Sequence, residues 1–591
     1  MNRFPAKVSF IWGIADLLRG DYKQSEYGQV ILPLTLLRRL DILRHPGGIA
    51  FGKLRVPGEV TRYVARFPAQ IREIFECFRF SEQLARLHKT GLLELLLQRF
   101  GEIDLRPESV SNQEMGYIFE ELIRKFSEQS GETAGEHFTP REVVRLMVQL
   151  VFEDGDATGK TLYDPACGTG GMLSAAEEYA AERNPAARLE IYGQELNPES
   201  YAICKADALL RGHDAGQIAL GNSFLDDAFA GRRFDYMLSN PPFGVEWKKA
   251  EKQIRLEHER LGFKGRFGAG LPRVNDGSLL FLEHMLSKMK PEGTRIAVVF
   301  NGSPLFTGEA GSGESEIRRW IIEQDWLEAI LGLPDQLFYN TGLSTYIWLL
   351  TNQKSRARAG QVQLINAASF SRKMRRSLGA KRNEIAPEQI EEIVAIHRQF
   401  RESRYSKIFR NEEFGYRRIT VERPLRLSFQ VSPERIAAAG AKFQPALTHI
   451  NPQAIYRDQT EFEKALAAAF QKAGLKLGRT LARKLSDAFG RQDDDAGIYR
   501  DSNGRPVPDP DLRDYENVPL REDAAAWFKN AVIPHAPNAW IDETRTRIGY
   551  SIPFTRHFFE PAPQRPLEEI EQEILSLEDE VRGMIRNFNT A

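Results

Sequence analysis

Asn240, Pro241, Pro242 and Phe243 form the motif whose residue types point most directly to chemistry. The side-chain oxygen of Asn240 and the carbonyl oxygen of Pro241 can both accept hydrogen bonds from one amino group, because the prolines fix the backbone and remove competing donors. Phe243 offers a face on which a planar ring can stack. The motif therefore suits an exocyclic amino group held for methyl transfer. A strand-terminating turn without chemistry is the alternative, since Asn-Pro pairs also mark ordinary turns.

A second motif, DPACGTGGML, occupies residues 164–173, between an expected strand and an alanine-rich stretch with helical character. Gly168, Gly170 and Gly171 lack Cβ atoms, so a ligand can approach the backbone there. The amides at the start of the helix can receive an anionic group such as a carboxylate. Leu173 stands where a dinucleotide fingerprint has its third glycine, and no Gly-Lys-Ser/Thr follows. The motif is therefore typical of neither an NAD site nor a P-loop.

The next two expected strands also end in residues that could contact a cofactor. Residues 188–195 end in Glu195, at the distance where α/β folds place an acid that bonds ribose hydroxyls. An acid that is merely solvated is the alternative for Glu195. Residues 218–227 contain Asn222 just after an apolar stretch, where it could touch an adenine ring, and an ordinary turn explains it equally well.

Strands and helices must position these motifs, and the apolar runs of the sequence predict that the two alternate along the chain. We expect a short strand at the start of residues 161–182, further strands within residues 188–195, 218–227, 234–239, 295–306, 326–334 and 344–352, and a helix at 278–289. Seven strands in this rhythm predict an α/β fold with a Rossmann-like, doubly wound sheet. Both motifs would then lie at the carboxyl edge of the sheet, where such folds bind their ligands.

With these motifs, the sequence resembles the adenine-specific DNA methyltransferases, and within them the methylation (M) subunit of type I restriction-modification systems. The resemblance extends to further stretches of the chain, at residues 14–41, 135–148, 336–352, 414–426 and 549–559. It implies S-adenosyl-L-methionine as methyl donor and adenine N6 in double-stranded DNA as acceptor. It also implies a specificity (S) subunit as partner, and it leaves open a second M subunit and a motor-nuclease (R) subunit.

The resemblance also implies residue roles. It makes Asn240, Pro241, Pro242 and Phe243 the target-adenine site. It implies cofactor contacts from Phe138, Thr139, Pro140, Asp164, Pro165, Ala166, Gly168, Thr169, Gly170, Gly171, Glu195 and Asn222. No metal site is expected, and His137 receives no chemical role. Two other functions stay open: methylation of another amine or amide, such as a protein glutamine, and a non-catalytic scaffold that binds the cofactor.

Bulk properties limit how the chain could hold DNA. The formal net charge of the 591 residues is -1, so a partner or a local patch must supply most phosphate contacts. One candidate is segment 371–383, with six basic residues and no acid, although a solvated loop is equally compatible. Another is segment 245–273, which we expect to be a mobile loop over the flipped base.

Three cysteines without metal-type spacing and the lack of a long apolar run favour a cytoplasmic protein without membrane contact. No Walker A motif or nuclease constellation is evident, so DNA cleavage would need other chains. The DNA recognition sequence, a preference for hemimethylated DNA and the stoichiometry are not readable from the chain.

We predict three regions. Residues 1–130 form a helical domain in which Arg19, Tyr22, Lys23, Arg38 and Arg39 could meet DNA or a second subunit, with a solvated helix surface as the default. Residues 131–430 form the catalytic domain with the basic extension.

Residues 431–591 form a carboxyl-terminal region with a long exposed loop at 490–514 and a helix at 567–588. Apolar residues follow the spacing of a coiled-coil seam in that helix, at Leu567, Ile570, Ile574, Leu577, Val581, Met584 and Phe588. We expect it to dock on a partner subunit. An amphipathic helix folded back on its own domain is the alternative.

Overall fold

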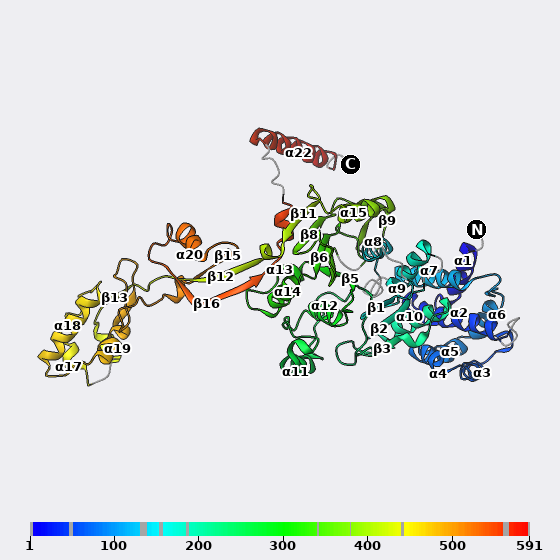
Figure 1. Ribbon diagram of the computed structural model, residues 1–591, viewed down its shortest axis with the longest axis horizontal. Coiled ribbons are helices and arrows are strands. Elements are labelled where there is room, and N and C mark those ends of the chain that lie inside the picture. Colours follow the sequence, from blue (N-terminus) through cyan, green and yellow to red (C-terminus); the bar gives the residue numbers. More distant parts are fainter. Residues whose placement is uncertain are drawn as a thin grey trace.

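The computed structural model describes residues 4–45, 51–130, 139–152, 158–184, 188–339, 342–378, 380–438, 442–559 and 566–588. The molecule is elongated (Figure 1). Amino-terminal helices form one end, a mixed sheet covered by helices lies in the middle, and a β arm carries a small helical lobe at the far end.

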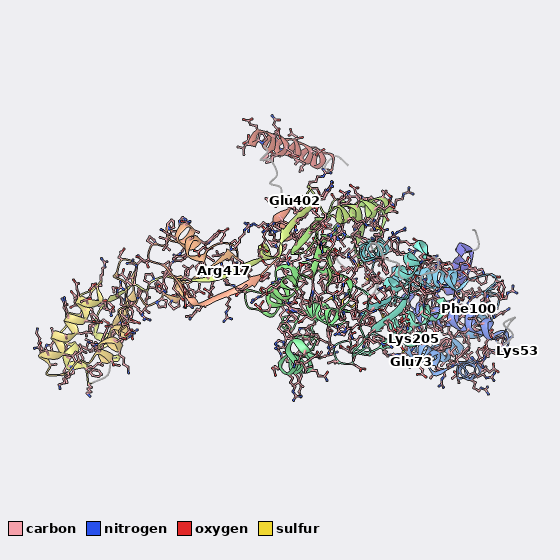
Figure 2. All side chains as sticks on the ribbon, viewed as in Figure 1. Lys53, Glu73, Phe100, Lys205, Glu402 and Arg417 are labelled. Atoms are coloured by element: carbon pink, nitrogen blue, oxygen red, sulfur yellow. The ribbon has the colours of Figure 1, made fainter. Side chains whose placement is uncertain are left out.

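The amino-terminal region is helical, as expected. Its helices are α1 (Phe4–Ala15), α2 (Tyr27–Arg44), α3 (Pro57–Val64), α4 (Ala69–Cys77), α5 (Phe80–Lys89), α6 (Leu93–Gly101) and α7 (Asn112–Ser130). Their core also takes in Ala202, Ile203, Ala206 and Leu210 of helix α10 (Pro198–Arg211). An ion pair of 2.7 Å joins Lys205 of α10 to Glu73 of α4, and both are labelled in Figure 2. These contacts fix the helical region to the sheet that carries the site.

The prediction that Arg38, Arg39 and Tyr22 face a partner is wrong. Arg39 is fully buried, and its guanidinium donates to the carbonyl of Val110 (3.0 Å) and to the side chain of Asn112 (2.8 Å). Arg38 is buried too, against the carbonyls of residues 101 and 103. Tyr22 is buried beneath the guanidinium of Arg86, 3.8 Å from its ring centroid. Carbonyls at the end of α6 and in the connection between α6 and α7 accept these hydrogen bonds, which explains why the arginines turn inward.

Nine strands form the central sheet in the order β11-β8-β6-β7-β5-β4-β1-β2-β3. The seven predicted strands are all present, as β1 (Thr161–Asp164), β2 (Glu190–Glu195), β3 (Ile218–Leu220), β4 (Tyr236–Ser239), β5 (Arg295–Asn301), β6 (Leu327–Gly332) and β7 (Thr345–Thr351). β7 runs antiparallel to β5 and β6. Two strands that we did not predict, β8 (Gln361–Asn366) and β11 (Ser406–Arg410), extend the sheet beyond β6.

Alternating side chains of the strands enter two separate cores, which makes the sheet doubly wound. Leu238, Ala297 and Val299 point to one core, which also holds side chains of α8 (Arg141–Val151), α9 (Gly171–Arg183), α10 and α15 (Pro387–Gln399). Met237, Ile296 and Val298 point to the other, with α12 (Ser278–Ser287), α13 (Ser303–Phe306) and α14 (Gly313–Glu323). Burial on both faces explains the near-continuous apolar runs that predicted these strands.

A three-stranded antiparallel arm leads away from the sheet. It consists of β15 (Asp514–Pro519), β12 (Gly415–Glu422) and β16 (Trp540–Tyr550), in that order. β16 returns to the catalytic region, where the carbonyl of Tyr550 accepts a 2.6 Å hydrogen bond from the guanidinium of Arg318. Short helices α20 (Ala524–Trp527) and α21 (Phe554–His557) belong to the same stretch of chain.

The lobe at the end of the arm contains α16 (Pro433–Ala438), α17 (Gln444–Leu447), α18 (Gln459–Lys472), α19 (Arg479–Phe489), β13 (Leu427–Phe429) and β14 (Gly490–Gln492). Residues 490–514 are largely exposed, as expected of a loop, but they also contribute to the core of the lobe. Tyr499 is buried there, and Ile498 and Pro508 form bridges to Arg426 and Pro424. The isolated bridges follow no sequence periodicity, which is why the pattern predicted a loop.

The last helix, α22 (Leu567–Phe588), has the predicted extent and stands apart from the rest of the chain in Figure 1. Its apolar seam is uncovered: Ile574, Leu577 and Val581 are each more than half exposed. The side chains of Met584 and Phe588 lie outside the described part. No helix in the described ranges combines the length and apolarity that crossing a bilayer requires.

Candidate active site

A cavity of about 1160 Å³ opens where the strands of the sheet end, and both sequence motifs meet in it. Asp164 closes β1, Glu195 closes β2, and Asn240 directly follows β4. The volume of the cavity exceeds the about 300–1,000 Å³ of common ligand pockets, so the cavity has room for a nucleotide-sized cofactor together with a base. The cavity therefore occupies the carboxyl edge that the sequence predicted.

The turn between β1 and α9 gives the cavity a floor of bare backbone. Gly168 (φ 54°) and Gly170 (φ 87°) are in the left-handed region, which residues with a Cβ rarely adopt. A Cβ on Gly170 would lie 2.8 Å from Sγ of Cys204, so space also requires glycine there. Helix α9 begins at Gly171. Its first amides have no partner within the helix and can bind an anionic group.

Asp164 is a buried carboxyl group in the cavity wall. Its Oδ1 accepts hydrogen bonds from the Ala166 amide (2.9 Å) and from the Ser239 hydroxyl (2.8 Å). Burial raises the pKa of Asp164 to about 7, and the charge of nearby Glu195 acts in the same direction. Asp164 can therefore change its charge near neutral pH.

Glu195, expected to bond ribose hydroxyls, uses both carboxylate oxygens to hold backbone. Oε2 accepts from the amide of Gly168 (2.8 Å) and Oε1 from the amide of Asn197 (2.7 Å). The residue therefore fixes the glycine turn to the end of β2. Each carboxylate oxygen can accept a second hydrogen bond, so a hydroxyl in the cavity can still bind it.

The loop after β3 forms a further wall of the cavity. Oδ1 of Asn222 accepts from the amide of Phe224 (2.9 Å), which closes a short turn. The hydroxyl of Ser223 donates to the carbonyl of Pro165 (2.6 Å). This hydrogen bond connects the loop to the motif that follows β1. A contact between residues so far apart in the chain gave no signal in the sequence.

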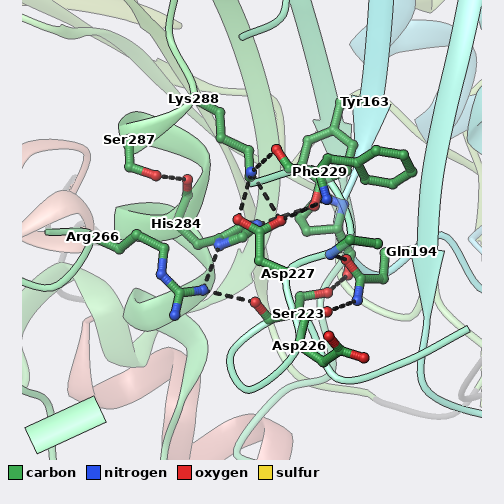
Figure 3. Close-up of polar contacts among 12 residues, drawn as sticks. Tyr163, Gln194, Ser223, Asp226, Asp227, Phe229, Arg266, His284, Ser287 and Lys288 are labelled. Carbon is green, nitrogen blue, oxygen red and sulfur yellow. Dashed lines mark hydrogen bonds and ion pairs between the residues drawn. The ribbon is translucent and has the colours of Figure 1, made fainter. Parts of the chain in front are cut away.

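Arg266 holds this loop from the opposite side (Figure 3). Its guanidinium donates to the carbonyls of Ser223 (2.9 Å) and Phe224 (2.8 Å) and forms an ion pair with Glu257 (2.7 Å). It also donates to Nδ1 of His284 (3.3 Å), whose Nε2 lies 3.0 Å from the hydroxyl of Tyr163. Burial holds the pKa of His284 well below its usual range, so the ring is neutral and can accept from Arg266.

The segment that carries Arg266 is folded, so the expectation of a mobile loop at 245–273 is wrong. It contains α11 (Glu251–Leu261), and Trp247, Ile254 and Phe267 are buried in a small core of their own. Trp247 also lines the cavity. The lysines, arginines and glycines of this segment predicted a mobile loop. The widely spaced apolar residues that form the core gave too weak a pattern to predict it.

Asn240 carries the most informative geometry of the site. Its side-chain nitrogen donates to the hydroxyl of Thr139 (3.0 Å). Its Oδ1 is buried and has no hydrogen-bond partner within the described ranges. A buried acceptor without a partner costs about 1–3 kcal/mol, so such a group points to a ligand that supplies the donor.

Phe243 lies at the same wall. Its ring is half-buried and meets the ring of Phe338 edge-on, with centroids 6.3 Å apart. Pro241 is buried, whereas Pro242 is exposed and lines the cavity. A planar ring that enters the cavity can therefore meet Phe243 beside the unpaired oxygen of Asn240.

The cavity brings together most of the predicted site residues. Its lining includes Thr139, Asp164, Pro165, Ala166, Gly168, Thr169, Gly171, Glu195, Asn222, Asn240, Pro242 and Phe243. Among the described residues, Pro140, Gly170 and Pro241 lie outside this lining. Phe138 and His137 fall outside the described residues. The aromatic lining residues Phe224, Trp247 and Phe281 were missed, since a single aromatic residue carries no positional signal.

Comparisons with known proteins agree with this geometry. The profile of the N-6 DNA Methylase family matches residues 110–421, more than half of the chain, and that of the HsdM N-terminal domain matches residues 7–47. The type I restriction enzyme MjaIX methylase subunit of Methanocaldococcus jannaschii is 32% identical over 307 residues, which are 52% of this chain and 52% of that protein. The HindI methylase subunit of Haemophilus influenzae is 30% identical over 257 residues, 43% of this chain and 54% of that protein.

The chain thus spans about half the length of the curated relatives that it matches. Among solved structures, the type I restriction-modification methyltransferase subunit from Streptococcus thermophilus has a similar fold, with a TM-score of 0.58 and 20% identity. That similarity covers 70% of this chain and 97% of the other.

Proposed function

The chain belongs to the N-6 DNA methylase family, and from this premise we propose that it is the methylation subunit of a type I restriction-modification system. In this proposal it transfers a methyl group from S-adenosyl-L-methionine to N6 of an adenine in double-stranded DNA. The observation that carries the proposal is the buried, unpaired Oδ1 of Asn240 in a cavity that also contains the glycine turn.

The cavity offers suitable groups for the cofactor. The backbone at Gly168 and Gly171 and the first amides of α9 would receive its carboxylate, and Glu195 and Asn222 would face its sugar and base. Asp164 would lie near its positive charge, where the ionised carboxylate is favourable. When bound, S-adenosyl-L-methionine supplies the methyl group on a positively charged sulfur, which makes that methyl group electrophilic.

The residues of the NPPF motif would hold the acceptor. The lone pair of an aromatic amine is delocalised into the ring, so the nitrogen is a poor nucleophile. Oδ1 of Asn240 and the carbonyl of Pro241 would accept both N–H bonds, draw the nitrogen toward tetrahedral geometry and stabilise the positive charge that develops there. Alignment then supplies most of the catalysis, and the proton leaves afterwards to water.

Phe243 would compensate for part of the cost of exposing the base. An adenine inside a duplex must leave the stack, which costs a few kcal/mol. Stacking on an aromatic side chain returns about 1–3 kcal/mol per base. The half-buried ring of Phe243 beside the cavity is available for this contact.

In the proposed assembly a specificity subunit reads the DNA sequence. A second methylation subunit and a motor-nuclease subunit would join larger complexes. Two observations support an obligate partner: the net charge of -1 provides no general attraction to DNA, and the apolar seam of α22 is exposed.

The test is methyl transfer from labelled S-adenosyl-L-methionine to duplex DNA, by the chain alone and with a co-expressed specificity subunit. N6-methyladenine that forms only in the presence of the partner supports the proposal. Product from the chain alone would make it an independent methyltransferase. Cofactor binding without DNA product in either case would favour a protein substrate or a scaffold.

A further inference from the structure

A basic hairpin stands beside the candidate active site. Strands β9 (Arg372–Leu378) and β10 (Lys381–Glu384) pair antiparallel and form this hairpin. Backbone hydrogen bonds tie its β10 end to the segment after β6: the amide of Ala380 donates to the carbonyl of Tyr339 (2.8 Å), and that of Arg382 to the carbonyl of Gln336 (2.9 Å). The hairpin is therefore fixed to residues 336–339.

That segment lies directly behind the wall of the catalytic cavity, because its Phe338 packs against Phe243, which lines the cavity. Lys381, at the start of β10, is buried and donates to the carbonyl of Leu337 (3.0 Å). It also forms an ion pair with Glu142 of α8, the helix that begins just after Thr139 and Pro140. The position of the hairpin relative to the site is thus fixed at several points.

The basic side chains of the hairpin differ in whether they form ion pairs. Lys373, Arg375 and Arg382 are exposed, and none of them forms an ion pair within the described ranges. By contrast, Arg372 pairs with Glu384 (2.7 Å), and Lys381 is buried in its ion pair. Repulsion between three unpaired cations on one short hairpin disfavours folding slightly, so an anionic partner is their expected counterpart.

We propose that Lys373, Arg375 and Arg382 bind the phosphate backbone of duplex DNA next to the adenine in the cavity. This inference rests on the proposed function and names the surface that holds the substrate. In a strand, residues two apart share a face and lie about 6.8 Å apart. Lys373 and Arg375 can therefore contact neighbouring phosphates of one DNA strand. Contacts with phosphates position a duplex without reading its sequence, as a subunit without specificity of its own requires.

The test uses the complex of the full chain with its specificity subunit and measures DNA affinity as a function of salt. In the variant Lys373→Ala, Arg375→Ala, Arg382→Ala, each lost phosphate contact should reduce the slope of log K against log salt by about 0.9. Three contacts predict a reduction of about 2.7. The affinity at moderate salt should fall at least tenfold, whereas cofactor affinity and the methylation rate at saturating DNA should stay as in the wild type.

Two further variants make the test specific. Lys472→Ala, Lys476→Ala, Lys484→Ala removes three exposed cations from the distant lobe and should leave the slope unchanged. Arg375→Lys, Arg382→Lys keeps the charge and should bind DNA nearly as the wild type does.

An unchanged salt slope in the hairpin variant, while the wild-type complex methylates DNA, would overturn this inference alone. So would release of the specificity subunit by the hairpin variant without a change in slope, because the cations would then serve a protein partner. Failure of the wild-type complex to methylate any DNA would contradict the proposed function and this inference with it.

Discussion

The side-chain amide of Asn240 donates a hydrogen bond to the hydroxyl of Thr139 over 3.0 Å, although the two residues lie 101 positions apart in the chain. This contact fixes the nitrogen of Asn240, and the side-chain oxygen stays buried without a partner among the described residues. Thr139, before α8, therefore orients the side-chain amide of Asn240. Asn240, after β4, supplies the acceptor.

Removal of the Thr139 hydroxyl should lower the rate of methyl transfer. Thr139→Val keeps the shape of the side chain but loses the acceptor, so the amide of Asn240 can rotate. One hydrogen bond is worth about 1–1.5 kcal/mol, which predicts a fall of about tenfold in kcat. Thr139→Ser keeps the hydroxyl and should restore most of the rate. Equal rates for the valine variant and the wild type would disprove this orienting role.

Cofactor affinity should depend on pH through Asp164. The pKa of its carboxyl group is raised to about 7, so the group is neutral below that pH and charged above it. The cofactor carries positive charge and favours the ionised carboxylate, so its affinity should rise by at most about tenfold per pH unit as the pH approaches 7 and should level off above it. Asp164→Asn cannot ionise and should flatten the profile. Titration calorimetry between about pH 5.5 and 8.5 measures this, and the same slope in both proteins would refute it.

Arg266 should act as a positioning residue for the cofactor. Arg266→Ala releases the carbonyls of Ser223 and Phe224 and leaves Glu257 without its ion pair. We expect the KM for the cofactor to rise about tenfold with a smaller change in kcat, and the free energy of unfolding to fall by about 1.5–3 kcal/mol.

The matched control for Arg266 is Arg260→Ala on helix α11 of the same segment. Arg260 is exposed, and its side chain forms no hydrogen bond or ion pair with the described residues. Its removal should change stability by less than about 0.5 kcal/mol and leave the KM unchanged. An Arg266 variant that is as stable as this control and equal to it in KM would contradict the assigned role.

The seam of α22 should be needed for assembly and not for cofactor binding. Ile574→Glu with Val581→Glu places charges on two exposed apolar positions and should weaken association with the specificity subunit at least tenfold, since burial of an unpaired charge is costly. Asp579→Asn, on the same helix but off the seam, is the control. Sedimentation of the mixed subunits measures the effect. Intact assembly of the double variant would show that α22 docks elsewhere.

The motifs and the seven strands of the sheet were predictable because glycine turns, Asn-Pro-Pro and buried apolar runs are local signals. The Gly170 turn and the boundaries of α22 are examples. Arg38 and Arg39 were misassigned because they donate to backbone carbonyls 63–71 positions away, which no local pattern reveals. The same holds for Arg266, whose basic neighbours predicted a mobile loop. The added strands β8 and β11 were missed because the basic hairpin and α15 interrupt the strand rhythm between them.

The central claim is that Oδ1 of Asn240 accepts from the reacting amino group. The most direct measurement compares wild type and Asn240→Ala in complex with the specificity subunit, with methyl transfer to duplex DNA and cofactor affinity determined on the same samples. The account predicts that the alanine variant binds the cofactor within about twofold of the wild-type affinity. Its methylation rate should be at least about 100-fold lower, because it lacks the acceptor whose hydrogen bond strengthens in the transition state. Methylation by the alanine variant at the rate of the wild type would contradict it.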